Sequence, residues 1–521
     1  MKIEIADKKN LRVDFLDLNE KVKFENHFTR EKRDAKFRKY MSKVKFYKPN
    51  YNIPIQFWYE IKRLCIIEKL QYDFKEEGKL FRGVDKASLI KWCEKQIKGT
   101  EYQYYKMGDT YETVFLMVNN KYCRSDLSVA YGKTVTIYLA TKYLIDHGLE
   151  KKIMVTTFKP QLCNQMIGEM IGLHVDGQFP ISVWLSGKKS KNTPIVITNW
   201  QYAVNLDKKF TDMFTMLVHD ECHKSAAPSY KKLYEACTNI SSTIGLTGSL
   251  LEDRTAEDFS VIAMTGHTVK TVSKRDVIYQ GKASDGVVCF IELDYMDIGT
   301  KIRLVEDRYN PEISKLVSLD KERDAIQIFE WRIKLLSKFS LINLKNKGNG
   351  MVLFKSVTSG YAKRFIEKLK QYDPDKKYFY VDEDTPVRLR QEFAQYMEKN
   401  NDVIMVGTYE IIGTGTSINN LHWGLMLEPV KSFFMVEQYL GRFMRKHVNK
   451  KAFVFYDIVD DGRVVYDDNG SNKTSYNYFY SWYYSRLKQY KSHGFNIQHQ
   501  KFSKDEKTKS KNDNNKFKSL L

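Results

Sequence analysis

The sequence predicts an α/β protein with two parallel-sheet lobes and a small basic N-terminal α+β domain. Three observations lead to this fold class. The chain has 521 residues, which corresponds to three or four compact units at about 100–200 residues per domain. Two series of short apolar runs alternate with longer segments of helical period, as in layered parallel α/β proteins. Residues 1–95 have a different texture, because basic residues are dense there.

Both lobes are predicted from apolar runs that have the length and composition of buried strands. The runs of the first series begin at Lys152, Pro194, Met213 and Thr243. Those of the second series begin at Gly350, Lys377, Asp402, His422 and Lys451. Because these runs are almost continuously apolar, we expect helices to cover both faces of each sheet.

This pattern divides the chain into five segments. We expect a basic N-terminal domain at 1–95, a first lobe at 96–275, a connecting region entering the second lobe at 276–345, the second lobe at 346–495, and a Lys-rich flexible tail at 496–521. The connecting region has weak periodicity and many charges. The tail is polar and has almost no apolar period.

The composition favours a polyanionic partner. The formal net charge is +21 and the pI is about 9.3. No run reaches the roughly 18 apolar residues of a membrane span, and the N-terminus has no apolar signal region. The seven cysteines form no C-x-x-C pair, which fits a reducing compartment. We therefore expect a cytoplasmic protein that does not contact a membrane. We also expect a monomer.

The N-terminal segment contains a candidate nucleic-acid contact. Nine Lys and Arg residues lie between Arg30 and Lys48, with aromatic residues between them. Cations interleaved with aromatics can contact phosphates together with bases or sugars. The alternative is a charged, solvated face. The candidate phosphate contacts are Lys36, Arg38, Lys39 and Lys43.

A Gly-Lys-Thr tripeptide opens a helical segment at Gly132, Lys133 and Thr134. Such a junction offers free main-chain N–H groups, an ammonium for the β- and γ-phosphates and a hydroxyl for Mg²⁺. The complete phosphate-loop pattern is not met, since Leu127 replaces its first glycine. We expect Ala130 and Tyr131, which precede the tripeptide, to belong to the same ATP-binding loop.

Two carboxylates follow a later apolar run. Asp220 and Glu221 come directly after the run that begins at Met213, so they should emerge at the carboxyl edge of the sheet. Asp220 is suited to hold Mg²⁺, and Glu221 is suited to polarise the attacking water as a general base. Composition and spacing alone thus predict an ATPase with a basic surface.

Further motifs resemble those of superfamily 2 helicases, and they occur in the order typical of that family. Asp220 opens a D-E-C-H box, and the chain reads Q-x-x-G-R-x-x-R from Gln438, with Arg442 and Arg445 three residues apart on one face of the expected helix. The other matching segments carry Thr157, Thr198, Thr247, Ser249, Lys355 and Gly415.

The resemblance implies two RecA-like lobes and a role for each matching residue. Gly415 would bind ATP, and Arg442 and Arg445 would act with Gln438 as arginine fingers closing on the phosphates across a cleft between the lobes. His223, Thr247 and Ser249 would couple hydrolysis to movement. Thr157, Thr198 and Lys355 would contact DNA. The residue that reads adenine stays open, and Gln103 is the nearby candidate.

The function that follows from the resemblance is an ATP-dependent DNA helicase or translocase, with ATP and Mg²⁺ as cofactors. It would unwind or branch-migrate branched, duplex or single-stranded DNA intermediates in phage-type recombination, repair and replication. For a viral protein the compartment would be the host cytoplasm. Two alternatives are an RNA helicase of the same superfamily and a nucleic-acid annealing or clamp protein with weak ATPase. Motor contacts go mainly to phosphates and sugars, so the sequence does not separate DNA from RNA.

Overall fold

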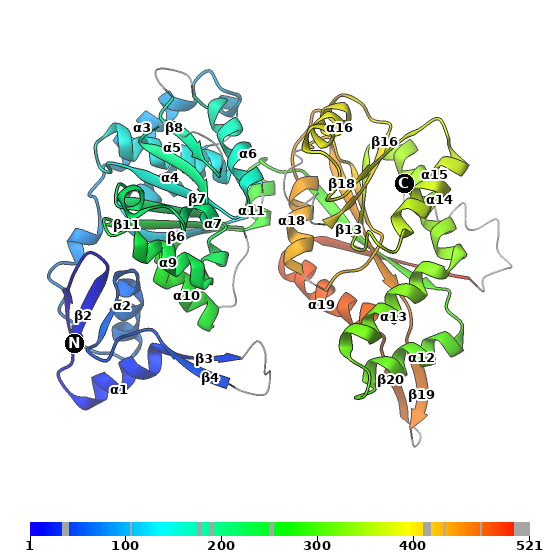
Figure 1. Cartoon of the computed structure of the whole chain (residues 1–521), viewed down its shortest axis with the longest axis horizontal. Helices are drawn as coiled ribbons and strands as arrows, with labels where there is room; N and C mark the ends of the chain where they lie inside the picture. The colour runs from blue at the N-terminus through cyan, green and yellow to red at the C-terminus, as the bar shows by residue number, and fades with distance from the viewer. Residues whose placement is uncertain are drawn as a thin grey trace. The chain divides into compact units, whose positions relative to one another are not determined.

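The chain forms two compact units, Met1–Ser273 and Lys274–Leu521, in a computed structural model (Figure 1). The structure describes residues 1–33, 41–104, 107–128, 130–174, 179–186, 192–248, 255–409, 418–431, 433–468 and 471–504. In this described part of the chain, no helix combines the length and the apolar character needed to cross a membrane.

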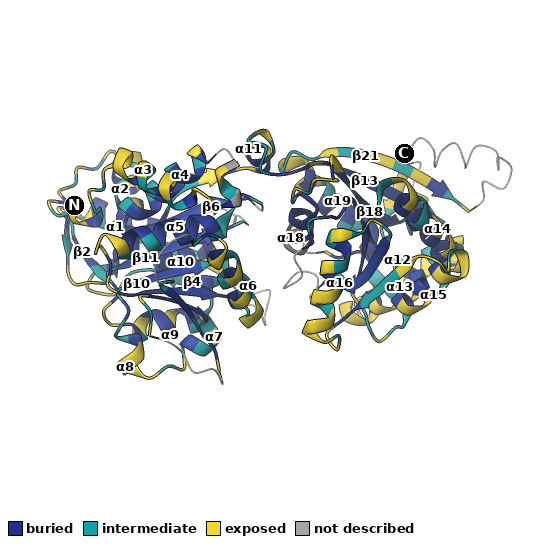
Figure 2. Cartoon of the chain, turned by 90° about the horizontal axis from the view of Figure 1, so that it is seen from above, coloured by how far each residue is buried: buried dark blue, intermediate teal, exposed yellow. Residues whose placement is uncertain are grey.

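The first unit contains a seven-stranded parallel sheet in the order β12-β6-β11-β10-β7-β9-β8. The four predicted strands are confirmed as β7 Ile153–Thr157, β9 Ile195–Asn199, β10 Met216–Asp220 and β11 Ser242–Thr247. Their residues are almost all buried, as the dark strands in Figure 2 show. Helices that include α4 Gly108–Asn119, α5 Lys133–Asp146, α6 Pro160–Ile171, α9 Pro228–Ala236 and α10 Ala256–Thr265 surround this sheet.

Three strands of this sheet are absent from the sequence prediction: β6 Tyr122–Leu127, β8 Ile181–Trp184 and β12 His267–Val272. The sequence of β6 contains polar residues and so does not predict a buried strand, although every one of its residues is buried. Arg124 lies 2.7 Å from Asp258 on α10 and donates to Thr268 on β12 at 2.7 Å. Partners from distant segments of the chain thus allow polar residues of β6 to be buried. A strand buried in this way has no apolar run in its sequence.

The N-terminal segment is α+β, as predicted. An antiparallel sheet joins β1 Lys2–Ile5, β2 Asn10–Asp14 and β5 Asn52–Pro54, and a hairpin joins β3 Thr29–Arg33 and β4 Met41–Lys45. The helices of this part are α1 Leu18–His27 and α2 Trp58–Ile67.

This N-terminal part packs closely on the first parallel sheet. The Phe57 ring lies 5.6 Å from the Phe259 ring of α10, and Gln56 donates to the Tyr234 hydroxyl at 2.9 Å. One hydrophobic cluster contains residues of both parts. The predicted boundary at residue 95 falls inside α3 Lys86–Ile97. A shared core therefore replaces the expected separation of domains.

The second unit is built on another seven-stranded parallel sheet, in the order β15-β16-β14-β17-β18-β13-β21. The five predicted strands are confirmed as β14 Gly350–Phe354, β15 Lys377–Val381, β16 Val403–Thr408, β17 Trp423–Met426 and β18 Ala452–Asp460. Among the other elements are α15 Tyr361–Tyr372, α16 Val387–Lys399, α18 Phe433–Phe443 and α19 Tyr478–Ser492, and a hairpin of β19 Val464–Asp468 and β20 Ser471–Ser475.

The expected connecting region, 276–345, belongs to this unit. It contains β13 Asp285–Asp294, which pairs with β18, together with α12 Ile298–Tyr309, α13 Lys315–Ile328 and most of α14 Glu330–Lys347. Arg332 of α14 forms a fully buried ion pair with Asp460 at 2.7 Å. The many charges of residues 276–345 led to the prediction of a connecting region. Several of these charges form ion pairs inside the fold.

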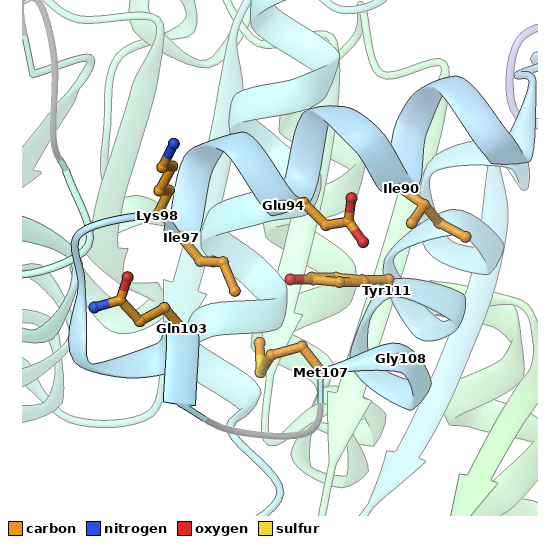
Figure 3. Close-up of a pocket in the computed structure, with 8 residues that line it drawn as sticks. All are labelled: Ile90, Glu94, Ile97, Lys98, Gln103, Met107, Gly108 and Tyr111. Atoms are coloured by element: carbon orange, nitrogen blue, oxygen red, sulfur yellow. The ribbon is translucent and has the colours of Figure 1, made fainter.

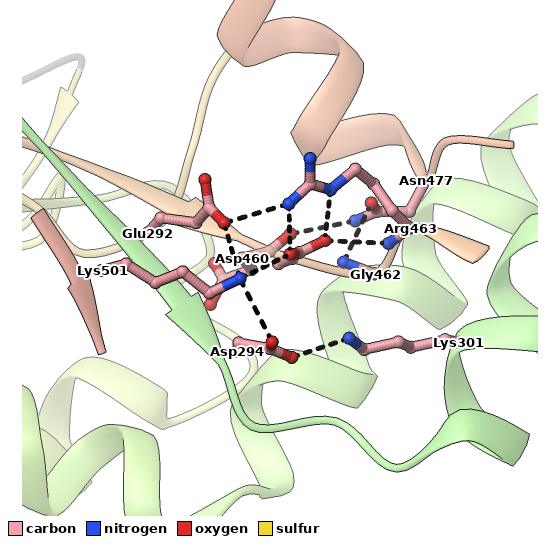
Figure 4. A network of polar contacts seen from close by, with 9 residues as sticks. Glu292, Asp294, Lys301, Asp460, Gly462, Arg463, Asn477 and Lys501 are labelled. Carbon is pink, nitrogen blue, oxygen red and sulfur yellow. Dashed lines mark hydrogen bonds and ion pairs between the residues drawn. The ribbon is translucent and has the colours of Figure 1, made fainter. Parts of the chain in front are cut away.

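The prediction of a flexible tail from residue 496 is wrong for its first eight residues. They form β21 Asn496–Ser503, which pairs in parallel with β13 at the edge of the sheet. Lys501 Nζ lies 3.1 Å from Glu292 and 3.3 Å from Asp294 (Figure 4). An edge strand is held by main-chain hydrogen bonds and one covered face, so a polar sequence can form it. Residues 505–521 lie outside the described residues.

Candidate nucleotide site

The Gly-Lys-Thr tripeptide lies where β6 ends and α5 begins, and Lys133 is the first residue of α5. Gly132 has φ +102° and Ala130 has φ +66°, both in the left-handed region. Only glycine adopts this region without strain, so Ala130 occupies a position that suits glycine. Val129 lies outside the described residues. A strand, a tight loop and a helix N-terminus are the geometry that presents main-chain N–H groups to phosphate.

Tyr131 ties this loop to the neighbouring helix α4. Its side chain is buried, and its hydroxyl lies 2.7 Å from Thr113 Oγ1 and donates to the Asp109 carbonyl oxygen at 2.9 Å. Both partners belong to α4. Tyr131 is thus an anchor of the predicted ATP-binding loop. Its two partners lie far back in the chain, and no sequence motif marks them.

Lys133 and Glu221 form the central ion pair of the site, with Nζ 2.6 Å from Oε1. Burial opposes the charge on both groups, but their mutual attraction outweighs it. The pKa of Lys133 is raised by Glu221 and Asp220, and the pKa of Glu221 is lowered by Lys133 and His223. Both groups are therefore charged at neutral pH. The structure brings the predicted phosphate-binding lysine and the predicted general base into direct contact.

Asp220 is the last residue of β10, and its Oδ1 is buried with no hydrogen-bond partner among the described residues. Burial raises the pKa of Asp220 to about 6, against the opposing effect of Lys133. A buried acceptor without a donor beside a lysine and a second carboxylate fits a ligand of hydrated Mg²⁺. Thr134, the other predicted metal ligand, follows Lys133 in the first turn of α5.

We expect Asp220→Asn to stabilise the ligand-free protein while removing Mg²⁺-dependent ATP hydrolysis. The folded protein raises this pKa from 3.8 to about 6, so it binds the proton more tightly than the unfolded chain does. Stability from this group is present at low pH and is lost as the pH rises through about 6. The variant should unfold about 2–4 °C higher at pH 7.5, the shift expected for 1 kcal/mol, and the gain should shrink at pH 5.

Thermal unfolding without nucleotide at the two pH values measures this difference. Asp207→Asn, a change at an exposed carboxyl group of the same unit, is the control and should show no such gain at pH 7.5. An Asp220→Asn protein that unfolds at a lower temperature than the wild type at pH 7.5 would contradict the prediction.

His223 and Thr247 connect the carboxylates to the neighbouring strand. His223 Nδ1 lies 2.8 Å from Thr247 Oγ1 at the end of β11 and 3.4 Å from Glu221 Oε2. Burial lowers the pKa of His223 to about 4, so its imidazole is neutral at pH 7. This contact joins two of the three residues predicted to couple hydrolysis to movement. The third, Ser249, lies outside the described residues.

Gln103 lines a pocket of about 490 Å³ between α3 and the start of α4 (Figure 3). Its other lining residues are Ile90, Glu94, Ile97, Lys98, Met107, Gly108 and Tyr111. The pocket and the phosphate loop meet the same helix, since Tyr131 is bonded to the first turns of α4. Gln103 Oε1 already accepts the Gly99 N–H at 3.1 Å.

The predicted DNA-binding residues differ in accessibility. Lys43 on β4 and Lys355 after β14 are exposed, whereas Thr157 and Thr198 are completely buried. Thr157 donates to the Lys159 carbonyl oxygen at 3.1 Å, and Thr198 to that of Trp184 at 2.8 Å. The described conformation therefore gives these two hydroxyls an internal role. Lys36, Arg38 and Lys39 lie outside the described residues.

The remaining predicted residues belong to the second unit. Gln438 and Arg442 lie in α18, but this helix ends at Phe443, so Arg445 lies in the turn behind it. The expectation that one helix carries both arginines is thus wrong. Arg442 is buried, and burial together with Arg445 lowers its pKa to about 9. The last residue of α18 is held by Lys450, which donates to the carbonyl oxygens of Phe443 and Asn419 at 2.9 Å each. Gly415 lies outside the described residues.

Comparisons with known proteins show what this chain is similar to. A family model described as "Type III restriction enzyme, res subunit" matches residues 117–251, which include the ion pair of Lys133 and Glu221. Two solved structures share the fold. The type ISP restriction-modification enzyme LlaBIII bound to DNA has a TM-score of 0.53 and 11% identity, over 80% of this chain and 32% of that one. A fragment of a putative HsdR subunit of a type I restriction enzyme from Vibrio vulnificus YJ016 has a TM-score of 0.52 and 14% identity. The match covers 89% of this chain and 76% of that one.

The two solved structures confirm the predicted fold of two RecA-like lobes. A curated relative supports the predicted resemblance to superfamily 2 helicases. Among curated proteins, the chain is similar to the ATP-dependent DNA helicase uvsW of Enterobacteria phage T4. The two are 26% identical over 394 residues, which cover 74% of this chain and 75% of that protein.

Proposed function

We propose that this protein is an ATP-dependent DNA helicase or translocase that unwinds or branch-migrates DNA intermediates in recombination, repair and replication. The observation that carries the proposal is a series of contacts in the first unit. It runs from the Lys133 ammonium through Glu221 and His223 to Thr247, and so links a phosphate loop to the next strand of the sheet. The similarity to uvsW and the net charge of +21 support DNA as the partner.

In the proposed reaction, the loop around Gly132 binds the phosphates of ATP and Lys133 exchanges Glu221 for a phosphate oxygen. Glu221 then orients and deprotonates the attacking water. Asp220 and Thr134 would hold Mg²⁺, which neutralises phosphate charge when bound. Arg442 and Arg445 remain the proposed cations for the transferred phosphoryl group, on the strength of the family resemblance.

The pocket that Gln103 lines is the proposed place for the adenine base. The Gln103 amide N–H₂ can donate to a ring nitrogen while its oxygen is held by Gly99. The apolar side chains of the pocket offer a surface for the ring.

The experiment that tests the function is phosphate release measured with single-stranded DNA, duplex DNA, a four-way junction, RNA or no nucleic acid. We expect DNA to stimulate hydrolysis, and the four-way junction to be unwound when ATP is present. Stimulation by RNA alone would favour the RNA helicase. Tight DNA binding with no stimulated hydrolysis would favour an annealing or clamp protein.

Neutralising the basic segment from Arg30 to Lys48 should weaken DNA binding for all sequences alike. Each cation that no longer neutralises a phosphate of duplex DNA should reduce the slope of log K against log salt by about 0.9. Binding titrations at several salt concentrations measure this slope for a variant with alanine at Lys36, Arg38, Lys39 and Lys43. A control with the same reduction in charge on α8 Lys208–Thr211 and α9 carries alanine at Lys208, Lys209, Lys231 and Lys232, all exposed. Equal slopes for the two variants would mean that the segment from Arg30 to Lys48 is only a solvated face.

A further inference from the structure

The loop between β14 and α15 runs from Lys355 to Gly360 with the sequence K-S-V-T-S-G. Lys355 is exposed and carries the predicted DNA contact. A single lysine on a loop loses side-chain and main-chain freedom when it binds a phosphate, so its contribution depends on how firmly the loop is held. The residue that holds this loop lies outside the segment around Lys355 that resembles a helicase motif.

Glu428 binds the first two residues of the loop through their main chain. Its Oε2 accepts the Lys355 N–H at 2.6 Å and the Ser356 N–H at 2.9 Å, and its Oε1 accepts from Gln327 Nε2 at 2.5 Å. Only 2% of Glu428 is exposed. It follows β17, and Gln327 belongs to α13, so one carboxylate joins three segments that are distant in the sequence.

A buried carboxylate requires compensation for the water it gives up, and hydrogen bonds from N–H groups supply it. Among the described residues, Glu428 has no ion pair with a lysine or arginine, and its side chain accepts from two main-chain groups and one amide. Its charge is thus satisfied chiefly by the loop itself. The two N–H groups can face one oxygen only when the main chain at residues 355 and 356 has one particular conformation.

We propose that Glu428 is a positioning residue for nucleic-acid binding. It fixes the main chain at Lys355 and Ser356, and thereby presents the Lys355 ammonium to one backbone phosphate of the bound strand. This inference rests on the proposed function, because it presumes a nucleic-acid partner. Glu428 itself is buried and does not touch the nucleic acid.

The test is a double-mutant cycle on the full chain, with duplex DNA binding measured at several salt concentrations. Lys355→Ala should reduce the salt slope by about 0.9, the value expected when one phosphate is no longer neutralised. In Glu428→Gln, one acceptor oxygen is replaced by an N–H₂ group, which cannot accept from the Lys355 and Ser356 N–H groups or from Gln327. The loop should therefore be freed, and the salt slope should fall by about as much as in Lys355→Ala. The double variant should bind no more weakly than either single variant, because both changes remove the same interaction.

Tyr409→Phe is the matched control. The Tyr409 hydroxyl donates to the main-chain carbonyl oxygen of Glu428 at 2.9 Å, so this variant loses a buried hydrogen bond at the same residue and leaves the carboxylate intact. It should keep the wild-type salt slope. Hydrogen exchange at the Lys355 and Ser356 amides should become faster in Glu428→Gln and stay slow in the control.

Glu428→Asp keeps the charge but shortens the reach, so it should give an intermediate slope, and it serves as the second variant if Glu428→Gln does not fold. Additive effects in the cycle, or a wild-type slope in Glu428→Asp, would overturn the inference and leave the proposed function intact. A normal slope in Lys355→Ala would do the same. Failure of the wild-type protein to bind DNA would remove the proposed function together with the inference.

Discussion

Replacing Lys133 by alanine should reduce ATP hydrolysis below detection. Lys133 begins the helix behind the phosphate loop, and among the described residues no other lysine or arginine forms an ion pair with Glu221. In the variant, the phosphates lose the cation that holds them. Binding of ATP and its hydrolysis should therefore be lost together.

Single-turnover phosphate release and nucleotide binding by fluorescence would measure both effects. The matched control is Lys142→Ala, which removes a lysine from the same helix and breaks its 2.6 Å ion pair with Asp146. That variant should hydrolyse ATP as the wild type does. Far-ultraviolet circular dichroism shows whether each variant is folded. A folded Lys133→Ala protein with normal hydrolysis would refute the assignment of the phosphate loop.

The sequence predicted the centre of each sheet better than its edges. Inner strands such as β10 and β14 are buried on both faces, and this forces a continuous apolar run that is visible in the sequence. In contrast, β21 lies at an edge and has only one buried residue, while β6 is buried but contains paired charges. Pairing between distant residues, such as Arg124 and Asp258, has no local signature.

For the candidate site, the sequence predicted which residues matter more fully than how they are held. Lys133 and Glu221 were both assigned from motifs, and the structure adds that they contact each other. The supports of the site have no motif. The hydroxyl of Tyr131 finds its partners on α4, and the loop at Lys355 is held by Glu428. Such supports depend on which segments become neighbours, which only the folded chain determines.

Replacing Glu221 by glutamine should separate binding from hydrolysis. Glu221 has φ +53°, a left-handed conformation that is uncommon outside glycine, and this places its carboxylate beside the Lys133 ammonium. In the ligand-free protein that contact keeps the pKa of Glu221 low and its basicity weak. When ATP draws Lys133 to its phosphates, the lowering effect is reduced and Glu221 becomes a stronger base at the moment it is needed.

Glutamine retains the shape of the side chain and its hydrogen-bonding reach but cannot accept a proton, so hydrolysis should slow by about 10²–10⁴-fold, the usual contribution of a general base. The dissociation constant for ATP should change little, because the loop and Lys133 remain. Single-turnover hydrolysis and equilibrium ATP binding on the same preparation measure the two quantities. Glu235→Gln, the same change at an exposed position of α9, is the control and should leave both unchanged. If Glu221→Gln loses ATP binding as completely as it loses hydrolysis, Glu221 serves to hold Lys133 and the loop in place, and the base must be sought elsewhere.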